Sequence, residues 1–267
     1  MEFKNNKVKI CVVGAGNIGS AMARGLAKSG VTVSVYNRSR NRLDALAGIV
    51  GISCTTELPE ALDGCDIALI CVEGDAVLSV AGTMASNFGH KAPVVGSCAA
   101  AVPMDELSKA LRTSAGESLA VFRLLPNIAA TVGCSANLLC GSGLSEADMA
   151  RLAELFSCTG TTVEIPERLF PAAMALSSCG IAYALRYVRA NMLAGVQMGL
   201  SPEASRELAA GVLAGTAKLL ESDPAHPEAL IDRVTTPGGV TIRGLNAMEE
   251  GGFSASIVSG LLATLKR

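Results

Sequence analysis

The stretch KVKICVVGAGNIG, residues Lys7–Gly19, decides the fold of this 267-residue chain. Its first part, Lys7–Val13, is a run of apolar and β-branched residues that predicts a buried strand, and a helical apolar pattern starts at Ile18. Between them, Gly14-Ala15-Gly16-Asn17-Ile18-Gly19 follows the G-x-G-x-x-G pattern. A glycine-rich turn between a strand and a helix is the setting in which backbone N–H groups bind the pyrophosphate of a dinucleotide. The alternative is a glycine-rich turn without a ligand.

The end of the next predicted strand, Val31–Tyr36, bears on which dinucleotide binds. Sites for NAD usually carry Asp or Glu there to accept a hydrogen bond from the ribose 2′-hydroxyl. This chain instead has Asn37, Arg38 and Ser39, which are hydrogen-bond donors suited to a 2′-phosphate. Charge-assisted bonds of about 1.5–3 kcal/mol predict a roughly ten- to hundredfold preference for NADPH over NADH. The alternative is a solvated basic loop.

The rest of the first half alternates strand and helix patterns. Further strands are predicted at 66–72, 92–97, 119–124, 135–140 and 161–165, and helices at 18–29, 40–46, 76–87, 102–111 and 145–156. Continuously apolar strands alternating with helices indicate a mostly parallel, doubly wound sheet that helices cover on both faces. The predicted fold class is therefore an α/β Rossmann domain at the N-terminus.

From Glu167 onward the sequence shows only helical patterns, at about 168–199, 201–222, 226–233, 238–250 and 254–265. We therefore predict a Rossmann domain over 1–165 and an all-α domain over 166–267. The uncharged stretch Leu169–Leu185 has 17 residues, short of the ~20 that span a bilayer, so we interpret it as a buried helix rather than a membrane segment. Because these helices are apolar on most faces, we expect two chains to associate through them. A core formed within one chain is the alternative.

Composition argues against several classes of function. With 22 Lys+Arg against 24 Asp+Glu and 3% aromatic residues, the chain has neither the basic field nor the stacking platforms of a nucleic-acid-binding protein. Two histidines and no C-x-x-C pair disfavour a metal site and a Ser/His/Asp triad. The nine cysteines are expected to be reduced thiols, which predicts a cytoplasmic protein without a metal.

A second glycine-rich turn lies in the helical half, in Thr235-Thr236-Pro237-Gly238-Gly239-Val240-Thr241-Ile242. Pro-Gly-Gly ahead of a helix leaves backbone N–H groups free to bind a carboxylate, with hydroxyl groups of Thr236 and Thr241 nearby. The alternative is a plain helix start.

With these motifs the chain resembles the pyrroline-5-carboxylate reductase family, the last enzymes of proline biosynthesis. The resemblance runs from GAGNIG through the NRS of Asn37–Ser39, Ser97–Ala100, Pro126-Asn127 and Ser177–Tyr183 to TPGGVTIRGL and EEGGF. It implies an N-terminal Rossmann domain, an all-α C-terminal dimerisation domain and a homodimer or higher homo-oligomer. It also implies reduction of a small cyclic imine carboxylate by NADPH. The near-neutral charge of the chain, in turn, predicts neither nucleic acid nor a membrane as partner.

Carried over by position, the resemblance implies site residues in both halves. Thr241 is the implied catalytic residue, because it is expected to hydrogen-bond the ring nitrogen. The implied substrate-binding residues are Thr236, Gly239, Val240, Thr241 and Asp223. The implied cofactor-binding residues are Gly14, Gly16, Asn17, Ile18, Gly19, Asn37, Arg38, Ser39, Val72, Cys98, Ala99, Ala100 and Asn127.

Three functions stay open from the sequence. The leading one is NADPH-dependent reduction of 1-pyrroline-5-carboxylate to L-proline, and the predicted helix 168–199 contains no Lys to serve as the base that alcohol oxidation needs. The chain departs from the family at Glu73 (Lys in the family), Ile128, Cys179 and Ile181. These departures leave two alternatives: a reductase of another cyclic imine, and a catalytically impaired, NADP-binding regulatory protein.

Overall fold

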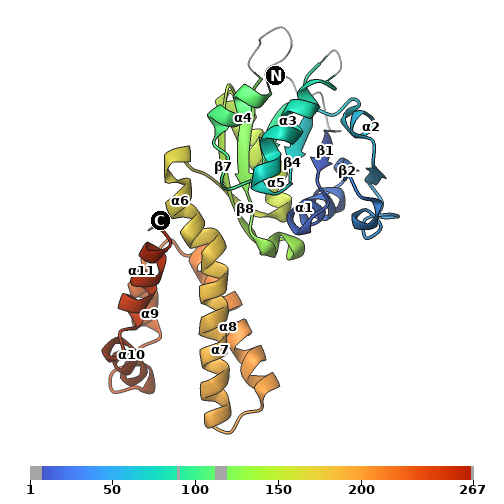
Figure 1. Cartoon of the computed structure of the whole chain (residues 1–267). Coiled ribbons are helices and arrows are strands. Elements are labelled where there is room, and N and C mark those ends of the chain that lie inside the picture. The colour runs from blue at the N-terminus through green and yellow to red at the C-terminus, as the bar shows by residue number, and fades with distance from the viewer. Residues whose placement is uncertain (1–7, 89–90, 112–118, 266–267) are drawn as a thin grey trace. The chain divides into compact units, whose positions relative to one another are not determined.

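The computed structural model describes residues 8–88, 91–111 and 119–265 (Figure 1). The chain divides into two compact units, Met1–Ser178 and Cys179–Arg267. The predicted domain boundary near Pro166 stays a prediction. After Pro166 come the short helix α6 (Phe170–Met174) and a π-helical turn (Ala175–Cys179), whose last residue is the first of the second unit.

Within the residues that the structure describes, the first unit contains one sheet of eight strands in the order β3-β2-β1-β4-β5-β6-β7-β8. All neighbours pair in parallel except β6 and β7, which are antiparallel. The mostly parallel, doubly wound sheet predicted from the sequence is confirmed. The strands are β1 (Lys9–Val13), β2 (Thr32–Tyr36), β3 (Ile52–Thr55), β4 (Ile67–Ile70), β5 (Val94–Ser97), β6 (Val121–Leu125), β7 (Ser135–Ser142) and β8 (Gly160–Glu164).

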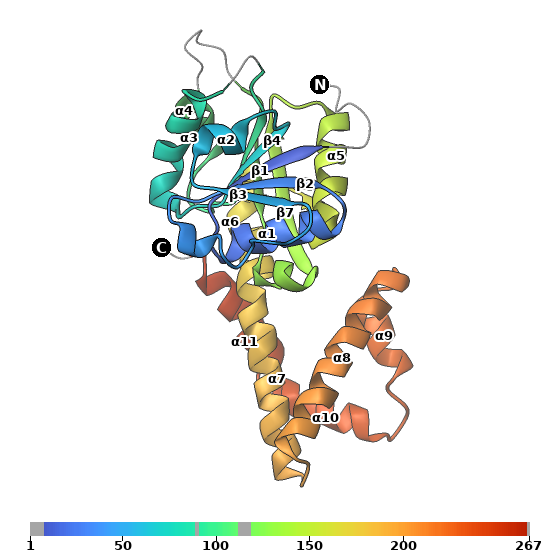
Figure 2. The same cartoon turned by 90° about the vertical axis from the view of Figure 1, so that its right-hand side faces the viewer.

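Helices cover both faces of this sheet because each strand points alternate side chains to opposite faces. Ile10 and Val12 of β1 pack in one core with α1 (Asn17–Lys28) and α5 (Glu146–Phe156). Cys11 and Val13 pack in the other core with the helices on the opposite face. These are α2 (Leu58–Leu62), α3 (Val77–Ala85) and α4 (Met104–Ala110), as Figure 2 shows. The carboxyl ends of β1, β2, β4 and β5 therefore share one edge of the sheet.

One predicted helix is wrong, and two elements are absent from the prediction. Residues 40–46 form a 3₁₀ turn, Arg40–Arg42, followed by further turns. The buried Leu43 and Leu46 have the spacing that indicated a helix, but a spacing of three also suits 3₁₀ turns. The edge strand β3 reads Ile-Ser-Cys-Thr and has no run of apolar residues, and the single-turn helix α2 is too short to produce a clear periodic pattern.

Among its described residues, the second unit contains helices joined by short loops and no strand. It consists of α7 (Gly180–Gln197), α8 (Pro202–Ser222), α9 (Pro227–Arg233), α10 (Val240–Glu250) and α11 (Phe253–Ala263). Ser201 caps α8, since its side chain accepts a hydrogen bond from the Ala204 N–H group at 3.1 Å. Helices α7 and α8 pack side by side (Figure 1). Tyr187 of α7 meets Phe253 of α11 with ring centroids 6.4 Å apart.

Large apolar side chains of the second unit remain exposed in the single chain. Leu185 is 59% exposed, Leu193 58% and Met198 75%. For the described part of the chain, the three clusters of buried apolar residues lie within the first unit. Among the described residues, the stretch Glu167–Gln197 is long and apolar enough to cross a membrane by length and composition alone. One chain does not bury most of this stretch as the sequence predicts: Phe170 and Ala173 lie in a buried cluster with Leu125 and Leu138, but most of α7 is half-buried or exposed.

Candidate functional site

The glycine-rich loop after β1 is held in a tight turn against β2 and β4. The Gly14 N–H group donates to the Tyr36 carbonyl at 2.8 Å, and Gly14 adopts a left-handed φ of 110°. A Cβ atom on Gly19 would lie 1.9 Å from the Gly14 carbonyl oxygen, so only glycine permits α1 to start this close to the strand. Gly14 and Gly19 therefore give the loop its shape.

Gly16 differs from these two glycines because the space beside it is open. The nearest atom to a Cβ placed there is Nη1 of Arg42, at 4.0 Å. Gly16 is also the N-cap residue of α1, no side chain of a described residue caps this helix, and its first turn has no acidic residue. Free N–H groups at Asn17, Ile18 and Gly19, together with the helix dipole, favour an anion. The loop thus fits a dinucleotide pyrophosphate.

Asn37 braces the glycine loop from the end of β2. Its Oδ1 atom accepts a hydrogen bond from the Ala15 N–H group at 3.1 Å, and its Nδ2 atom donates to the Ser39 carbonyl at 2.8 Å. The Asn37 side chain, predicted from the sequence to contact the cofactor, thus joins the glycine loop to the loop after β2. One N–H bond of its amide is not used in these two hydrogen bonds.

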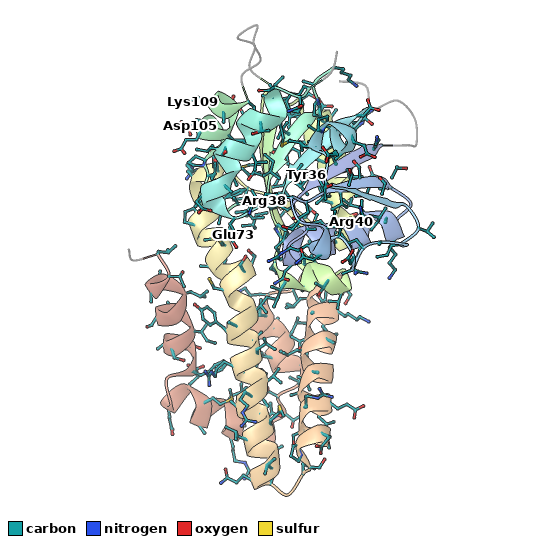
Figure 3. The ribbon with its side chains drawn as sticks, turned by 45° about the vertical axis from the view of Figure 1, so that its right-hand side comes forward. Tyr36, Arg38, Arg40, Glu73, Asp105 and Lys109 are labelled. Carbon is teal, nitrogen blue, oxygen red and sulfur yellow. The ribbon has the colours of Figure 1, made fainter. Side chains whose placement is uncertain are left out.

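Exposed arginines surround this loop. Figure 3 shows Arg38 and Arg40 at the same end of the sheet as Tyr36 and Glu73. Arg42 was not predicted from the sequence as a site residue, although its guanidinium is close to the open side of Gly16. Arg38, Arg40 and Arg42 alternate along the sequence, a pattern that could have indicated a role for Arg42. The predicted helix over 40–46 obscures this pattern. Together the arginines give the end of β2 a positive charge suited to phosphate groups.

The segments that follow β4 and β5 form the next part of this edge. Val72 lies against the glycine loop, since its Cγ1 atom would be 3.0 Å from a Cβ on Gly14. The thiols of Cys71 and Cys98 are hydrogen-bonded, with their sulfur atoms 3.5 Å apart. This bond and burial raise the pKa of the Cys98 thiol well above its ordinary value. Cys98 therefore stays protonated at neutral pH and is a poor nucleophile.

Asn127, predicted to contact the cofactor, is buried, and its side chain makes contacts within the chain. Its Oδ1 atom accepts from the Ala129 N–H group at 2.9 Å, and its Nδ2 atom donates to the Ser177 carbonyl at 3.0 Å. Ser177 lies in the π-helical turn, where such an outside partner relieves the loss of regular helical hydrogen bonds. Asn127 thus joins the loop after β6 to this turn.

The predicted substrate-binding residues all lie in the second unit, whereas the predicted cofactor-binding residues all lie in the first. Gly238 has a left-handed φ of 69°, and Gly239 is the N-cap residue of α10. The Gly239 N–H group donates to the Thr236 carbonyl at 3.0 Å. Thr236, Val240 and Thr241 are exposed in the single chain. The helix start at Val240 therefore leaves N–H groups and hydroxyl groups free for an anionic ligand.

Asp223 makes its contacts within the second unit. Its Oδ1 atom accepts from the Ala225 N–H group at 3.0 Å, and its Oδ2 atom pairs with Nη1 of Arg233 at 2.6 Å. The Ala225 N–H group and the Arg233 guanidinium lower the pKa of the Asp223 carboxyl. Asp223 thus stays ionised and orients the turn between α8 and α9.

The sheet and its phosphate-binding loop define a dinucleotide-binding protein of the Rossmann type with a helical second unit. Residues 9–100 match the family model described as NADP oxidoreductase, coenzyme F420-dependent. Residues 167–267 match the model for pyrroline-5-carboxylate reductase dimerisation. The pyrroline-5-carboxylate reductase of Methanosarcina acetivorans is 31% identical over 97% of this chain and 96% of its own length. The chain belongs to the pyrroline-5-carboxylate reductase family.

Solved structures agree with this fold. A pyrroline-5-carboxylate reductase from Coxiella burnetii matches with a TM-score of 0.89 and 23% identity, over 97% of this chain and 96% of the other. A pyrroline carboxylate reductase from Plasmodium falciparum, solved with NADP bound, matches with a TM-score of 0.80 and 24% identity, over 96% and 95%. The predicted Rossmann domain followed by a helical dimerisation domain is therefore confirmed as the fold class, and the match to a dimerisation domain supports an oligomer.

Proposed function

We propose that this protein reduces 1-pyrroline-5-carboxylate to L-proline with NADPH. The observation that carries the proposal is the 31% identity to a protein of this name over 97% of the chain, because it includes both the glycine loop and the helix start at Val240. The relative's activity is thereby assigned to this chain as a hypothesis. Reduction of another cyclic imine, favoured by the exposed Glu73 at the carboxyl end of β4, is the second candidate.

NADPH, when bound, supplies the hydride that reduces the C=N bond. The N–H groups at the start of α1 hold its pyrophosphate, and Gly16 allows the close approach. Arg38 and Ser39 bind the 2′-phosphate, which gives the preference over NADH, and Arg42 adds positive charge beside the pyrophosphate. Val72 and Cys98–Ala100 contact the nicotinamide half. No metal takes part, because a protonated imine is already electrophilic.

The substrate carboxylate binds at the start of α10. The N–H groups of Val240 and Thr241 and the hydroxyl of Thr236 hold it, and Gly239 leaves them room. The Thr241 hydroxyl hydrogen-bonds the ring nitrogen and so orients the imine. Because the imine nitrogen already carries its proton, hydride transfer needs no side chain to donate a proton to it.

Two chains associate through the exposed apolar faces of α7, α8 and α11 into a homodimer or a higher homo-oligomer. The match of residues 167–267 to a dimerisation domain supports this assignment, as do the exposed leucines of α7. The long apolar stretch then packs against a second chain rather than lipid, and the enzyme acts in the cytoplasm. In this scheme residues 1–165 are the cofactor domain and residues 166–267 the dimerisation and substrate domain.

Steady-state oxidation of NADPH tests this function. We expect oxidation with 1-pyrroline-5-carboxylate at a kcat/KM at least about tenfold above that with its six-membered analogue. The site must hold the carboxylate and the nitrogen together, and a site spaced for the five-membered ring fits the larger ring less well. Faster turnover of the six-membered imine would transfer the assignment to the second candidate. Tight binding of NADPH without oxidation in the presence of either imine would indicate the regulatory alternative.

A further inference from the structure

Arg123 is a buried cation in the middle of the sheet. It lies on β6 and is 5% exposed. Its Nη1 atom pairs with Oε1 of Glu167 at 2.8 Å, and its guanidinium carbon lies 4.9 Å from the centroid of the Phe170 ring. A buried charge is costly unless it is paired and hydrogen-bonded, so these contacts fix where the guanidinium lies.

The other end of the guanidinium holds the segment that follows β5. The Nη2 atom donates to the carbonyl oxygens of Ala99 at 3.3 Å and of Ala100 at 2.6 Å. In a trans peptide the N–H group points opposite to the preceding carbonyl, so the N–H groups of Ala100 and Ala101 point away from Arg123. Both alanines are exposed, and neither N–H group donates a hydrogen bond to a described residue. Arg123 thus leaves two free donors on an exposed segment.

Glu167 extends the hold to the far end of the same segment. Its Oε1 atom accepts from the Met104 N–H group at 2.8 Å, at the first residue of α4. The pair of Arg123 and Glu167 therefore fixes both ends of the connection from β5 to α4. A planar guanidinium can direct donors to a carboxylate and two carbonyls at once, which the ammonium of Lys cannot reproduce.

The order of the strands places this segment on one side of the dinucleotide site. The 2′-phosphate donors follow β2 and the glycine loop follows β1, and the sheet continues through β4 to β5. A dinucleotide that crosses this edge extends its nicotinamide half toward β5. We propose that Arg123 is a positioning residue: by anchoring the Ala99 and Ala100 carbonyls, it aims the free N–H groups of the segment at the nicotinamide half of NADPH. This inference rests on the function proposed above.

Binding of two ligands tests the inference. The ligands are NADPH and adenosine 2′,5′-bisphosphate, which contains only the adenine half. We expect Arg123→Lys and Glu167→Gln each to raise the Kd for NADPH about tenfold or more, since the segment loses an anchor. The Kd for the bisphosphate stays within about twofold, because the loop after β2 is unchanged. If Arg123 and Glu167 only stabilise the fold, the folded variants should bind NADPH and the bisphosphate with unchanged Kd values, or both Kd values should rise equally. Either result overturns the inference.

A matched control separates loss of stability from loss of position. Asn137 is also buried, and its Nδ2 atom donates to the Phe156 carbonyl, Thr159 and Thr162, away from the segment. Asn137→Ala should lower the melting temperature but leave both dissociation constants within about twofold. A rise in the NADPH constant equal to that of Arg123→Lys would contradict the inference. Wild-type protein that binds NADPH but does not reduce the imine contradicts only the proposed function, whereas failure to bind NADPH overturns both.

Discussion

Gly19→Ala is expected to destabilise the first unit by on the order of 3 kcal/mol or more, because the new methyl group overlaps the backbone. Its Cβ atom would lie 1.9 Å from the Gly14 carbonyl oxygen and 3.1 Å from Cβ of Cys71. Relief requires α1 to move away from β1, which opens the core that the two share. The measurement is the free energy of unfolding from a urea titration followed by circular dichroism.

Gly16→Ala is the matched control, since the same methyl group enters open space. With the nearest atom 4.0 Å away the methyl group meets no clash, so the free energy of unfolding should fall by no more than about 1 kcal/mol, the cost of Ala in place of Gly at an N-cap. The Kd for NADPH should nevertheless rise about tenfold or more, because the methyl group occupies the space that the pyrophosphate approaches. Equal destabilisation by the two substitutions, or unchanged NADPH binding by the folded Gly16→Ala protein, would contradict the roles given to these glycines.

Arg38→Ala should raise the KM for NADPH by about ten- to hundredfold and leave that for NADH nearly unchanged. The expected loss corresponds to about 1.5–3 kcal/mol of charge-assisted hydrogen bonding to a 2′-phosphate that NADH lacks. The ratio of the two kcat/KM values is the quantity to measure, because a general loss of activity cancels from it.

Lys28→Ala provides the control for Arg38, because it removes a positive charge at the opposite end of α1 from the glycine loop. It should leave the ratio of NADPH to NADH efficiency within about twofold, since a distant surface charge is screened by salt. If Lys28→Ala changed the ratio as much as Arg38→Ala does, the preference would come from bulk charge rather than from contact with the 2′-phosphate.

Much of the fold could be predicted from the sequence because its long elements carry strong local signals. The strand, glycine loop and helix of Lys9–Lys28 and the capped helix at Ser201 are found where the patterns predict them. The edge strand β3 was missed because Ile52–Thr55 is only partly buried and carries no run of apolar residues, and the helix predicted over 40–46 is a set of turns. Short elements depend on tertiary contacts, which local periodicity does not report.

The candidate site was predictable as a set of motifs but not as a set of contacts. The sequence indicates that Asn37 and Asn127 belong to the site, whereas the structure shows that their amides join backbone segments. The sequence does not indicate a role for Arg123. This arginine lies within an apolar strand and acquires its partners only when β5, β6 and the turn at Glu167 come together. Such long-range partners are invisible to spacing along the chain.

The transfer of hydride from NADPH to the imine carbon is the central claim, and isotopic labelling tests it most directly. NADPH carrying deuterium at the transferable C4 position is incubated with 1-pyrroline-5-carboxylate and the protein, and the product is analysed by mass spectrometry. The account predicts proline that carries one deuterium, located at ring carbon C5, with one NADPH consumed per proline formed. Proline without deuterium, or no proline while NADPH stays bound and unoxidised, would contradict it.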